Sequence, residues 1–254
     1  MNILITYAVE AEFAPWRALR NLEKVTVGGV ELHRAQVGRA IVDFVTTGMG
    51  SANAQRVTAA VISKDYSFCV ASGFAGALKA SVDSGDVVVA RKAQHDGNGG
   101  TVVCARNLWT GASSDGAKSI ESLLTTDHVV STAAEKARLA PFAEAVDMES
   151  FWILSVARTK QVPAIAIRVI SDSFDRDLPV DIDTMLDEQG NVRIGGVVRY
   201  VAKHPLTLPA LVRLGRESKT AAEALANFLE AYIKKLSFAT HGWPPPELLE
   251  VAAS

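Results

Sequence analysis

Three carboxylates stand where apolar, strand-like runs of this chain end. Glu12 follows an apolar run over 2–8, Glu149 follows a short run at 145–146, and Asp172 closes a run over 164–170. If these runs are strands of one open α/β sheet, ligands bind in the crevice at their carboxyl ends. Carboxyl groups gathered there could act as general acid and general base, or stabilise developing positive charge.

A structural role is the alternative interpretation for two of these acids. Glu149 could complement a helix dipole from the first turn, and Asp172 could be an N-cap. The stretch between Glu149 and Asp172 has the pattern of a helix followed by a strand, which would place both acids at one edge of the sheet. A helix is predicted over 151–159, and Pro163 then opens a continuous apolar run that is typical of a buried parallel strand.

Composition indicates a globular protein with a substantial core. The chain has 254 residues, of which 48% are hydrophobic and 21% charged, and no apolar run is long enough to span a membrane. A net charge of −2 argues against nucleic acid as a partner. The first residues lack a basic leader, and Cys69 and Cys104 lack metal spacing. We therefore expect a cytoplasmic protein with two reduced, buried thiols.

Strands and helices alternate along the chain. An antiparallel meander of three short strands is predicted over 25–46, then a helix over 52–62 capped by Ser51. A strand over 123–131 leads into a helix capped by Ser131 or Thr132. The pattern predicts an α/β fold: a single domain with a mixed, partly parallel central sheet flanked by helices.

Two small-residue loops follow predicted strands. Met49 and Gly50 precede a helix N-terminus, where an anion or a ligand hydroxyl could approach the backbone. A strand over 68–72 is expected to break at Gly73, and the loop through Phe74 and Ala75 would let the backbone close on a ligand.

The polar, glycine-rich stretch over 94–116 is expected to be an irregular excursion at the rim of the site. Its His95 could be a rim ligand, but a solvated loop histidine is the favoured interpretation.

The character of the chain changes after Asp172. An acidic loop is followed at about 191–219 by a basic segment with interleaved apolar residues. Such a segment could lie on an anionic membrane surface or a lipidic ligand, and the alternative is a solvated helix packed on the domain. A closing helix over 220–236 completes a domain predicted at 1–236, and a tail follows at 237–254. The basic residues are Arg193, Arg199, Lys203, Arg213, Arg216 and Lys219.

Four strand-end segments together carry a resemblance: AVEAE at 8–12, TGMGSANA at 47–54, VDME at 146–149 and RVISD at 168–172. In this order they resemble the purine nucleoside phosphorylase superfamily, nearest to the nucleosidases that hydrolyse methylthioadenosine and S-adenosylhomocysteine. The resemblance covers about residues 2 to 172 and the final helix. It implies a nucleoside phosphorylase-like fold, a small-molecule nucleoside substrate, a homodimer, and neither a metal nor an organic cofactor.

The resemblance also implies roles for individual residues. Glu12 would activate the attacking water, with Arg168 beside it, while Asp172 would assist the departing purine at N7. The remaining contacts would come from Met148 and Glu149 to the ribose, from Ser171 to Asp172, and from Val130 to the base.

Cleavage of an N-glycosidic bond suits these residue types. The ribosyl centre becomes oxocarbenium-like, so a carboxylate near the ribose hydroxyls stabilises its charge. The leaving purine needs a proton, so we expect Asp172 to be kept protonated by its surroundings, and the water needs a base on the opposite face of the sugar.

Departures from the pattern lie at Phe74, Val129 and Asp147. Phe74 replaces a small hydroxyl residue, Val129 an aromatic residue that would stack on the purine, and Asp147 a glutamate. Arg17 and Arg39 are candidates for holding phosphate, but neither lies in a phosphate motif, so hydrolysis is favoured over phosphorolysis.

Three alternatives remain open. Residues 173–219, and 204–214 in particular, look more like the hopanoid-associated phosphorylase branch, which implies removal of adenine from adenosylhopane. A lipid-tailed substrate would then be reached at a membrane surface. The second alternative is a phosphorylase, and the third is a nucleoside-binding protein that has lost catalysis. For the expected homodimer, the stretch over 94–116 is a candidate interface.

Overall fold

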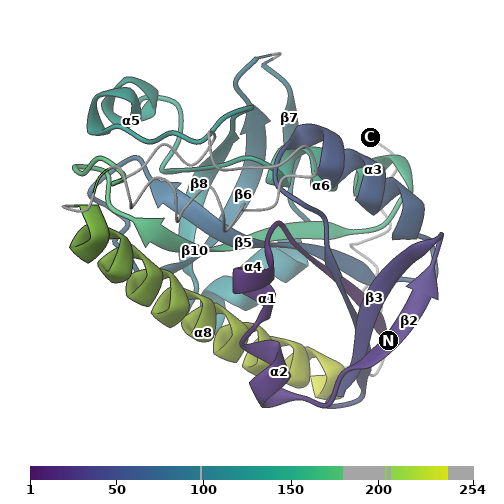
Figure 1. Cartoon of the computed structure of the whole chain (residues 1–254). Coiled ribbons are helices and arrows are strands. Elements are labelled where there is room, and N and C mark those ends of the chain that lie inside the picture. The colour runs from purple at the N-terminus through teal and green to yellow at the C-terminus, as the bar shows by residue number, and fades with distance from the viewer. Residues whose placement is uncertain (98, 180–203, 205–206, 240–254) are drawn as a thin grey trace.

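The computed structural model describes residues 1–97, 99–179, 204 and 207–239 (Figure 1). Much of the basic segment predicted at 191–219 therefore lies outside the described residues. Within the described helices, none combines the length and apolar character that crossing a membrane requires.

One mixed sheet organises this part of the chain. Its strand order is β10-β6-β8-β9-β5-β1-β4-β3-β2, with β7 paired to β6. The strands are β1 (Asn2–Tyr7), β2 (Glu23–Val27), β3 (Val30–Val37), β4 (Ala40–Thr46), β5 (Phe68–Ala77), β6 (Val87–His95), β7 (Thr101–Val103), β8 (Lys118–Thr125), β9 (Ala145–Asp147) and β10 (Ala164–Asp172).

Half of this sheet closes on itself. β10 pairs with both β5 and β6, while β9 pairs with both β5 and β8. Because β6 also pairs with β8, the pairings run from β5 through β10, β6, β8 and β9 back to β5. This ring brings the ends of β5, β9 and β10 close to one another, next to β1.

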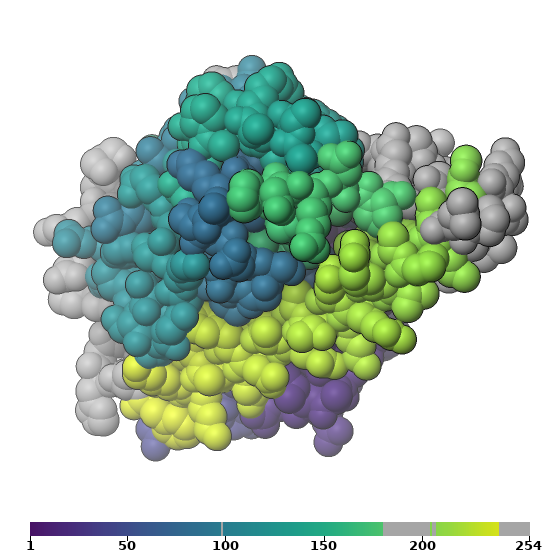
Figure 2. Space-filling model, turned by 90° about the vertical axis from the view of Figure 1, so that its left-hand side faces the viewer, coloured from purple at the N-terminus to yellow at the C-terminus, as the bar shows by residue number. Residues whose placement is uncertain are grey.

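Helices cover the sheet, with α8 along one side and α3 and α6 on the other (Figure 1). Figure 2 shows α8 as a yellow-green band across the surface of the molecule. The helices are α1 (Glu10–Phe13), α2 (Trp16–Leu19), α3 (Ser51–Val61), α4 (Arg106–Ser114), α5 (Ala133–Leu139), α6 (Ser150–Thr159) and α8 (Leu208–Ala239).

Burial explains the sequence pattern of the central elements. Residues 164–170 of β10 are all buried, so alternation is absent, as the prediction of a parallel strand requires. On α8, helical spacing places Leu225, Leu229, Tyr232 and Ile233 in the core. Cys69 and Cys104 are buried free thiols. The predicted meander and the α/β fold class are confirmed.

Two predictions about β5 and its neighbours were wrong. β5 does not break at Gly73 but continues to Ala77, because Gly73 adopts a φ of +137° that lets the strand stay paired with β10. The stretch over 94–116 is not irregular, since it holds the end of β6, β7 and α4. His95 is buried in β6 and packs against Phe151 and Trp152, with ring centroids 5.5 and 4.8 Å away.

The predicted helix ends also need correction. Gly50, not Ser51, is the N-cap of α3, and no side chain caps that helix. The strand expected over 123–131 ends at Thr125, while Thr132 caps α5 by accepting from the backbone N–H of Glu135. The predicted closing helix is part of the longer α8, which passes position 236 and reaches Ala239.

Candidate active site

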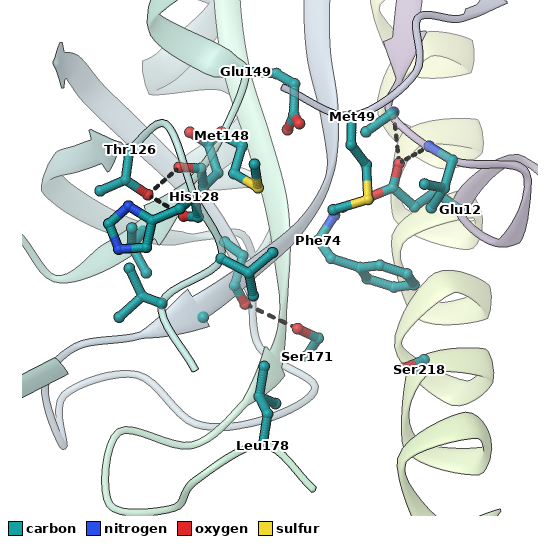
Figure 3. A pocket seen from close by; sticks show the side chains of 18 of the residues that line it. Glu12, Met49, Phe74, Thr126, His128, Met148, Glu149, Ser171, Leu178 and Ser218 are labelled. Carbon is teal, nitrogen blue, oxygen red and sulfur yellow. Dashed lines mark hydrogen bonds between the residues drawn. The ribbon is translucent and has the colours of Figure 1, made fainter. Parts of the chain in front are cut away.

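A pocket of about 280 Å³ lies at the carboxyl ends of the strands (Figure 3). Residues at or just after the ends of β1, β4, β8, β9 and β10 contribute to it, together with the last part of β5 and the first half of α8. The lining residues are Ala8, Val9, Ala11, Glu12, Met49, Phe74, Ala75, Gly76, Thr126, His128, Val129, Val130, Val146, Asp147, Met148, Glu149, Ser171, Leu178, Leu214 and Ser218.

Most of the predicted site residues line this pocket. In Figure 3, Met148 lies on one side of the pocket, Glu12 and Phe74 lie on the other, and Glu149 lies at the top of the view. Among the other predicted residues, Met49, Ala75, Val130 and Ser171 also line it, whereas Gly50, Gly73, Arg168 and Asp172 lie directly behind lining residues or next to them.

Glu12 is held by three backbone N–H groups. Its Oε2 accepts from Ala8 at 2.7 Å and from Val9 at 3.1 Å, while Oε1 accepts from Phe74 at 2.7 Å. The strand-to-helix turn after β1 therefore folds around the carboxylate. Burial raises the pKa of Glu12, although the Arg168 charge and the three N–H groups oppose this. A base with a raised pKa is better matched to proton abstraction near neutral pH.

Glu149 is buried where the first turns of two helices meet. Its Oε1 accepts from the backbone N–H of Gly50 at 2.9 Å, and its Oε2 lies 3.8 Å from Nη2 of Arg168. Burial raises the pKa of Glu149 to about 7 against the opposing effect of Arg168, and the nearby Asp147 adds to the rise. The backbone of Gly50 thus binds an anion, as the loop suggested, but the anion is the side chain of Glu149.

Arg168 lies behind the carboxylates and does not line the pocket. Its Nη2 is 2.8 Å from Oδ2 of Asp147, its Nη1 donates to the Ser72 carbonyl at 3.0 Å, and its Nε donates to Ser150 Oγ at 3.1 Å. Asp147 also accepts from the Thr125 hydroxyl at 2.7 Å. Arg168 is therefore placed to orient the acids, and Asp147 and Ser150 are partners that the sequence did not reveal.

Gly73 leaves room for this arrangement. A Cβ at this position would lie 2.5 Å from Oε1 of Glu12 and 2.6 Å from Nη1 of Arg168. Because Gly73 has no side chain, β5 can pass close to both the Glu12 carboxylate and the Arg168 guanidinium group. Gly73 therefore lies against the Glu12 carboxylate and does not line the pocket.

Asp172 has a partner that was not predicted. The Ser171 hydroxyl donates to its Oδ1 at 2.7 Å, and Nζ of the fully buried Lys136 lies 2.5 Å from its Oδ2. On α5, Lys136 stands between Glu135 and Arg138 in a sequence typical of a solvated face, and no sequence signal set it apart.

The family model of the Phosphorylase superfamily matches residues 2–194, well over half of the chain. The chain belongs to this superfamily.

Relatives within the superfamily are nucleosidases. The 5′-methylthioadenosine/S-adenosylhomocysteine nucleosidase of Shewanella loihica is 27% identical over 219 residues, covering 75% of this chain and 94% of that protein. The corresponding protein of Shewanella denitrificans is 25% identical with the same coverage. These similarities confirm the resemblance to the nucleosidase branch that the four segments indicated.

Solved structures share the fold. A methylthioadenosine/S-adenosylhomocysteine nucleosidase of Helicobacter pylori, crystallised with butyl-thio-DADMe-Immucillin-A, matches with a TM-score of 0.70 and 19% identity, covering 92% of this chain and 98% of that one. Futalosine hydrolase of the same organism matches with a TM-score of 0.71, 19% identity and the same coverage. At this identity the likeness shows the phosphorylase superfamily fold.

The three departures from the superfamily pattern, Phe74, Val129 and Asp147, all line the pocket. Phe74 donates its backbone N–H to Glu12 and places its ring at the pocket (Figure 3). The pocket is also lined by Leu178, Leu214 and Ser218. Leu178 follows shortly after the motif at 168–172, whereas Leu214 and Ser218 come from α8 and fall within the segment singled out at about 191–219.

Neither arginine considered for phosphate lies at the pocket. Arg17 pairs with Glu10 at the surface, and Arg39 lies 5.1 Å from the ring centroid of Phe238. Among the described residues that line the pocket, none is a lysine or arginine. Within the described part of the chain, no group of three or more His, Cys, Asp or Glu side chains could hold a metal ion.

Proposed function

We propose that this protein is a purine nucleosidase that cleaves the N-glycosidic bond of an adenosine-type nucleoside carrying a 5′ substituent. Water is the nucleophile and adenine is released. The observation that carries the proposal is that two buried carboxylates, those of Glu12 and Glu149, line one pocket (Figure 3). A sugar bound beside them has a base and a charge-stabilising group within the same pocket.

The reaction follows from this placement. Glu12 accepts a proton from water, which attacks the anomeric carbon while the bond to the purine nitrogen breaks. Glu149 accepts hydrogen bonds from the ribose hydroxyls and stabilises the oxocarbenium-like centre. Asp172 lies next to Gly76, which lines the pocket, and donates a proton to N7 of the departing base, so that neutral adenine leaves. Met148 packs against the ribose, and Val130 contacts the base.

Hydrolysis is supported over phosphorolysis by charge. A phosphate nucleophile requires cationic side chains beside the sugar, because an anion buried without such partners is strongly unfavourable. The described pocket lining holds no lysine or arginine, and the buried Arg168 already donates to Asp147, Ser72 and Ser150. Water needs no such partners.

The 5′ substituent is proposed to be apolar. Phe74, Leu178 and Leu214 line the pocket, and Leu214 belongs to the first half of α8. In Figure 2 the green residues that follow β10 lie beside the yellow-green first turns of α8. These side chains suit an alkyl or thioether group.

A lipid-tailed adenosine, such as adenosylhopane, is the second candidate substrate. The same turns of α8 expose Leu208 and Val212, which are 49% and 44% accessible, and the cations Arg213, Arg216 and Lys219 stand beside them. Apolar and basic side chains on one helix suit an anionic membrane surface. We place the enzyme in the cytoplasm and propose that it acts as a homodimer.

Release of the purine base from a panel of nucleosides tests the proposal. The panel holds adenosine, methylthioadenosine, S-adenosylhomocysteine, futalosine and a long-alkyl 5′-adenosine, each with and without phosphate. We expect phosphate-independent release from the adenosines that carry an apolar 5′ group. Activity confined to the long-alkyl compound would favour the lipid-tailed candidate, and dependence on phosphate would make the protein a phosphorylase.

A catalytically inactive nucleoside-binding protein is the outcome that would overturn the proposal. In that case the nucleosides would bind, as measured by calorimetry, but no compound of the panel would release its base.

A further inference from the structure

Lys136 is a fully buried cation beside the pocket. Its ammonium group lies 2.5 Å from Oδ2 of Asp172 and donates to the carbonyls of Ser173 and Arg176 at 2.7 and 3.1 Å. A lysine has three N–H donors, so these contacts satisfy the group completely. A buried charge is tolerated only with such partners. All three hydrogen bonds of the Lys136 ammonium group thus go to Asp172 and to the segment that follows it.

The helix that carries Lys136 also holds that segment at its other end. The backbone N–H of Ala133 donates to Oδ1 of Asp177 at 2.7 Å, and the N–H of Leu178 donates to the carbonyl of Ser131 at 2.7 Å. Leu178 lines the pocket. The segment 173–178 is therefore hydrogen-bonded to α5 and to the residues just before it. Among these contacts, the one from Lys136 also includes the carboxyl group of Asp172, the candidate acid.

Both oxygens of Asp172 have fixed partners. Ser171 donates to Oδ1 and Lys136 to Oδ2, while the side chain keeps 16% of its surface accessible. The carboxylate is thereby fixed in direction and still open to a ligand. A buried ion pair is weak support for stability, because an apolar pair of similar size is often as good. A need to orient the Asp172 carboxylate accounts better for a lysine at position 136 than a contribution to stability does.

We propose that Lys136 is a positioning residue for the cleavage reaction. It holds Asp172 in the direction from which Asp172 meets the leaving base, and it sets the segment that brings Leu178 to the pocket. This inference rests on the proposed function, because only base release gives Asp172 a partner.

A double-mutant cycle tests the coupling. Lys136→Met removes the ammonium group and keeps the apolar stem, Asp172→Asn removes the carboxylate, and the double variant removes both. For the panel nucleoside that wild type cleaves fastest, we expect Lys136→Met to lower kcat at least about tenfold, with KM changed much less, since general acids contribute about a hundredfold or more. The double variant should be no slower than Asp172→Asn, because coupled residues are not additive.

The matched control is Arg138→Met, which removes an exposed cation from the same helix and should leave kcat unchanged. If Lys136→Met does not fold by circular dichroism, Lys136→Gln takes its place in the cycle. Lys136 loses its proposed role if the two losses multiply, or if a folded Lys136 variant keeps the wild-type kcat.

Adenine binding separates this inference from the proposed function. Calorimetry with adenine as the probe needs no turnover, and the same four proteins should show the same non-additive loss of affinity. Wild type that releases no base but shows the coupled loss would overturn the nucleosidase and leave Lys136 as a residue that positions Asp172 for binding of the base. If wild type releases base but the two substitutions lower the affinity for adenine independently, the nucleosidase stands and Lys136 loses its positioning role.

Discussion

The Glu149 carboxylate accepts a hydrogen bond of 2.9 Å from the backbone N–H of Gly50. Glu149 immediately precedes α6, and Gly50 is the N-cap of α3, so one carboxylate joins the starts of two helices. The positive end of a helix macrodipole favours a negative charge at that place. One oxygen of Glu149 is held in this way before any ligand arrives, which leaves the pocket side of the group for ribose hydroxyls.

The raised pKa of Glu149 predicts a pH-dependent stability. Its value of about 7 in the folded protein lies above the ordinary 4.5, so the folded state binds the proton more tightly. The resulting stabilisation is complete below pH 4.5 and is lost as the pH rises through 7. Relative to Glu149→Gln, which does not titrate, wild type should therefore lose roughly 3 kcal/mol of unfolding free energy over this window.

Urea unfolding at pH 5 and pH 8 measures this difference. Glu121→Gln is the control, because Glu121 is 57% exposed on the surface and lies away from the pocket lining. A gap between wild type and Glu149→Gln that is the same at both pH values would contradict the prediction.

Glu12→Gln is expected to bind substrate but not to turn it over. An amide cannot accept the proton from water, so kcat should fall by a factor of about a hundred to ten thousand. The amide NH₂ would also face a backbone N–H that now donates to the carboxylate, which should cost about 1–3 kcal/mol of stability. Steady-state kinetics and calorimetry below the unfolding temperature separate the two effects.

Glu10→Gln is the matched control for that variant, since Glu10 lies in the same short helix with a side chain that is 56% exposed. Unchanged turnover in Glu12→Gln would remove Glu12 from the mechanism.

Gly73→Ala should destabilise the protein through contact with the site as well as through the backbone. The new Cβ would meet Glu12 and Arg168 at 2.5 and 2.6 Å, at a φ of +137°. Gly85 offers a comparison, because its φ is +94° and a Cβ there would meet nothing within 4 Å. Strain of the backbone alone costs about 1–3 kcal/mol, so Gly85→Ala should lose that amount and Gly73→Ala clearly more. Equal losses in thermal or urea unfolding would show that the close contacts relax freely.

The sequence predicted those parts of the site that follow strands. Glu12, Glu149 and Asp172 each end an apolar run, and a buried strand leaves a clear apolar pattern. Asp147 stands within the motif at 146–149 and Ser150 directly follows it, but their contact with Arg168 depends on how β9 and β10 lie relative to each other. Register and tertiary packing of that kind leave no local pattern in the chain.

Lys136 could not be predicted for a related reason. Its helix is short and rich in charged residues, which is the pattern of a solvated face, and only the return of the chain after β10 covers it. The break predicted in β5 failed because a glycine was interpreted as the end of a strand. Gly73 instead lets the strand continue past two buried charged groups.

Leu214→Ala is expected to alter the choice of 5′ substituent. Leu214 lines the pocket from α8, whereas Val212 on the same helix is 44% exposed and does not. Each buried methylene contributes about 0.8 kcal/mol, so kcat/KM for a long-alkyl 5′-adenosine should fall about tenfold or more in Leu214→Ala. Adenosine, which has no apolar 5′ group, should be nearly unaffected, and Val212→Ala should match wild type on both substrates. An equal loss on both substrates in Leu214→Ala would place the 5′ group elsewhere in the pocket. A loss confined to Val212→Ala, and only with the substrate in anionic vesicles, would instead assign the first turns of α8 to a membrane surface.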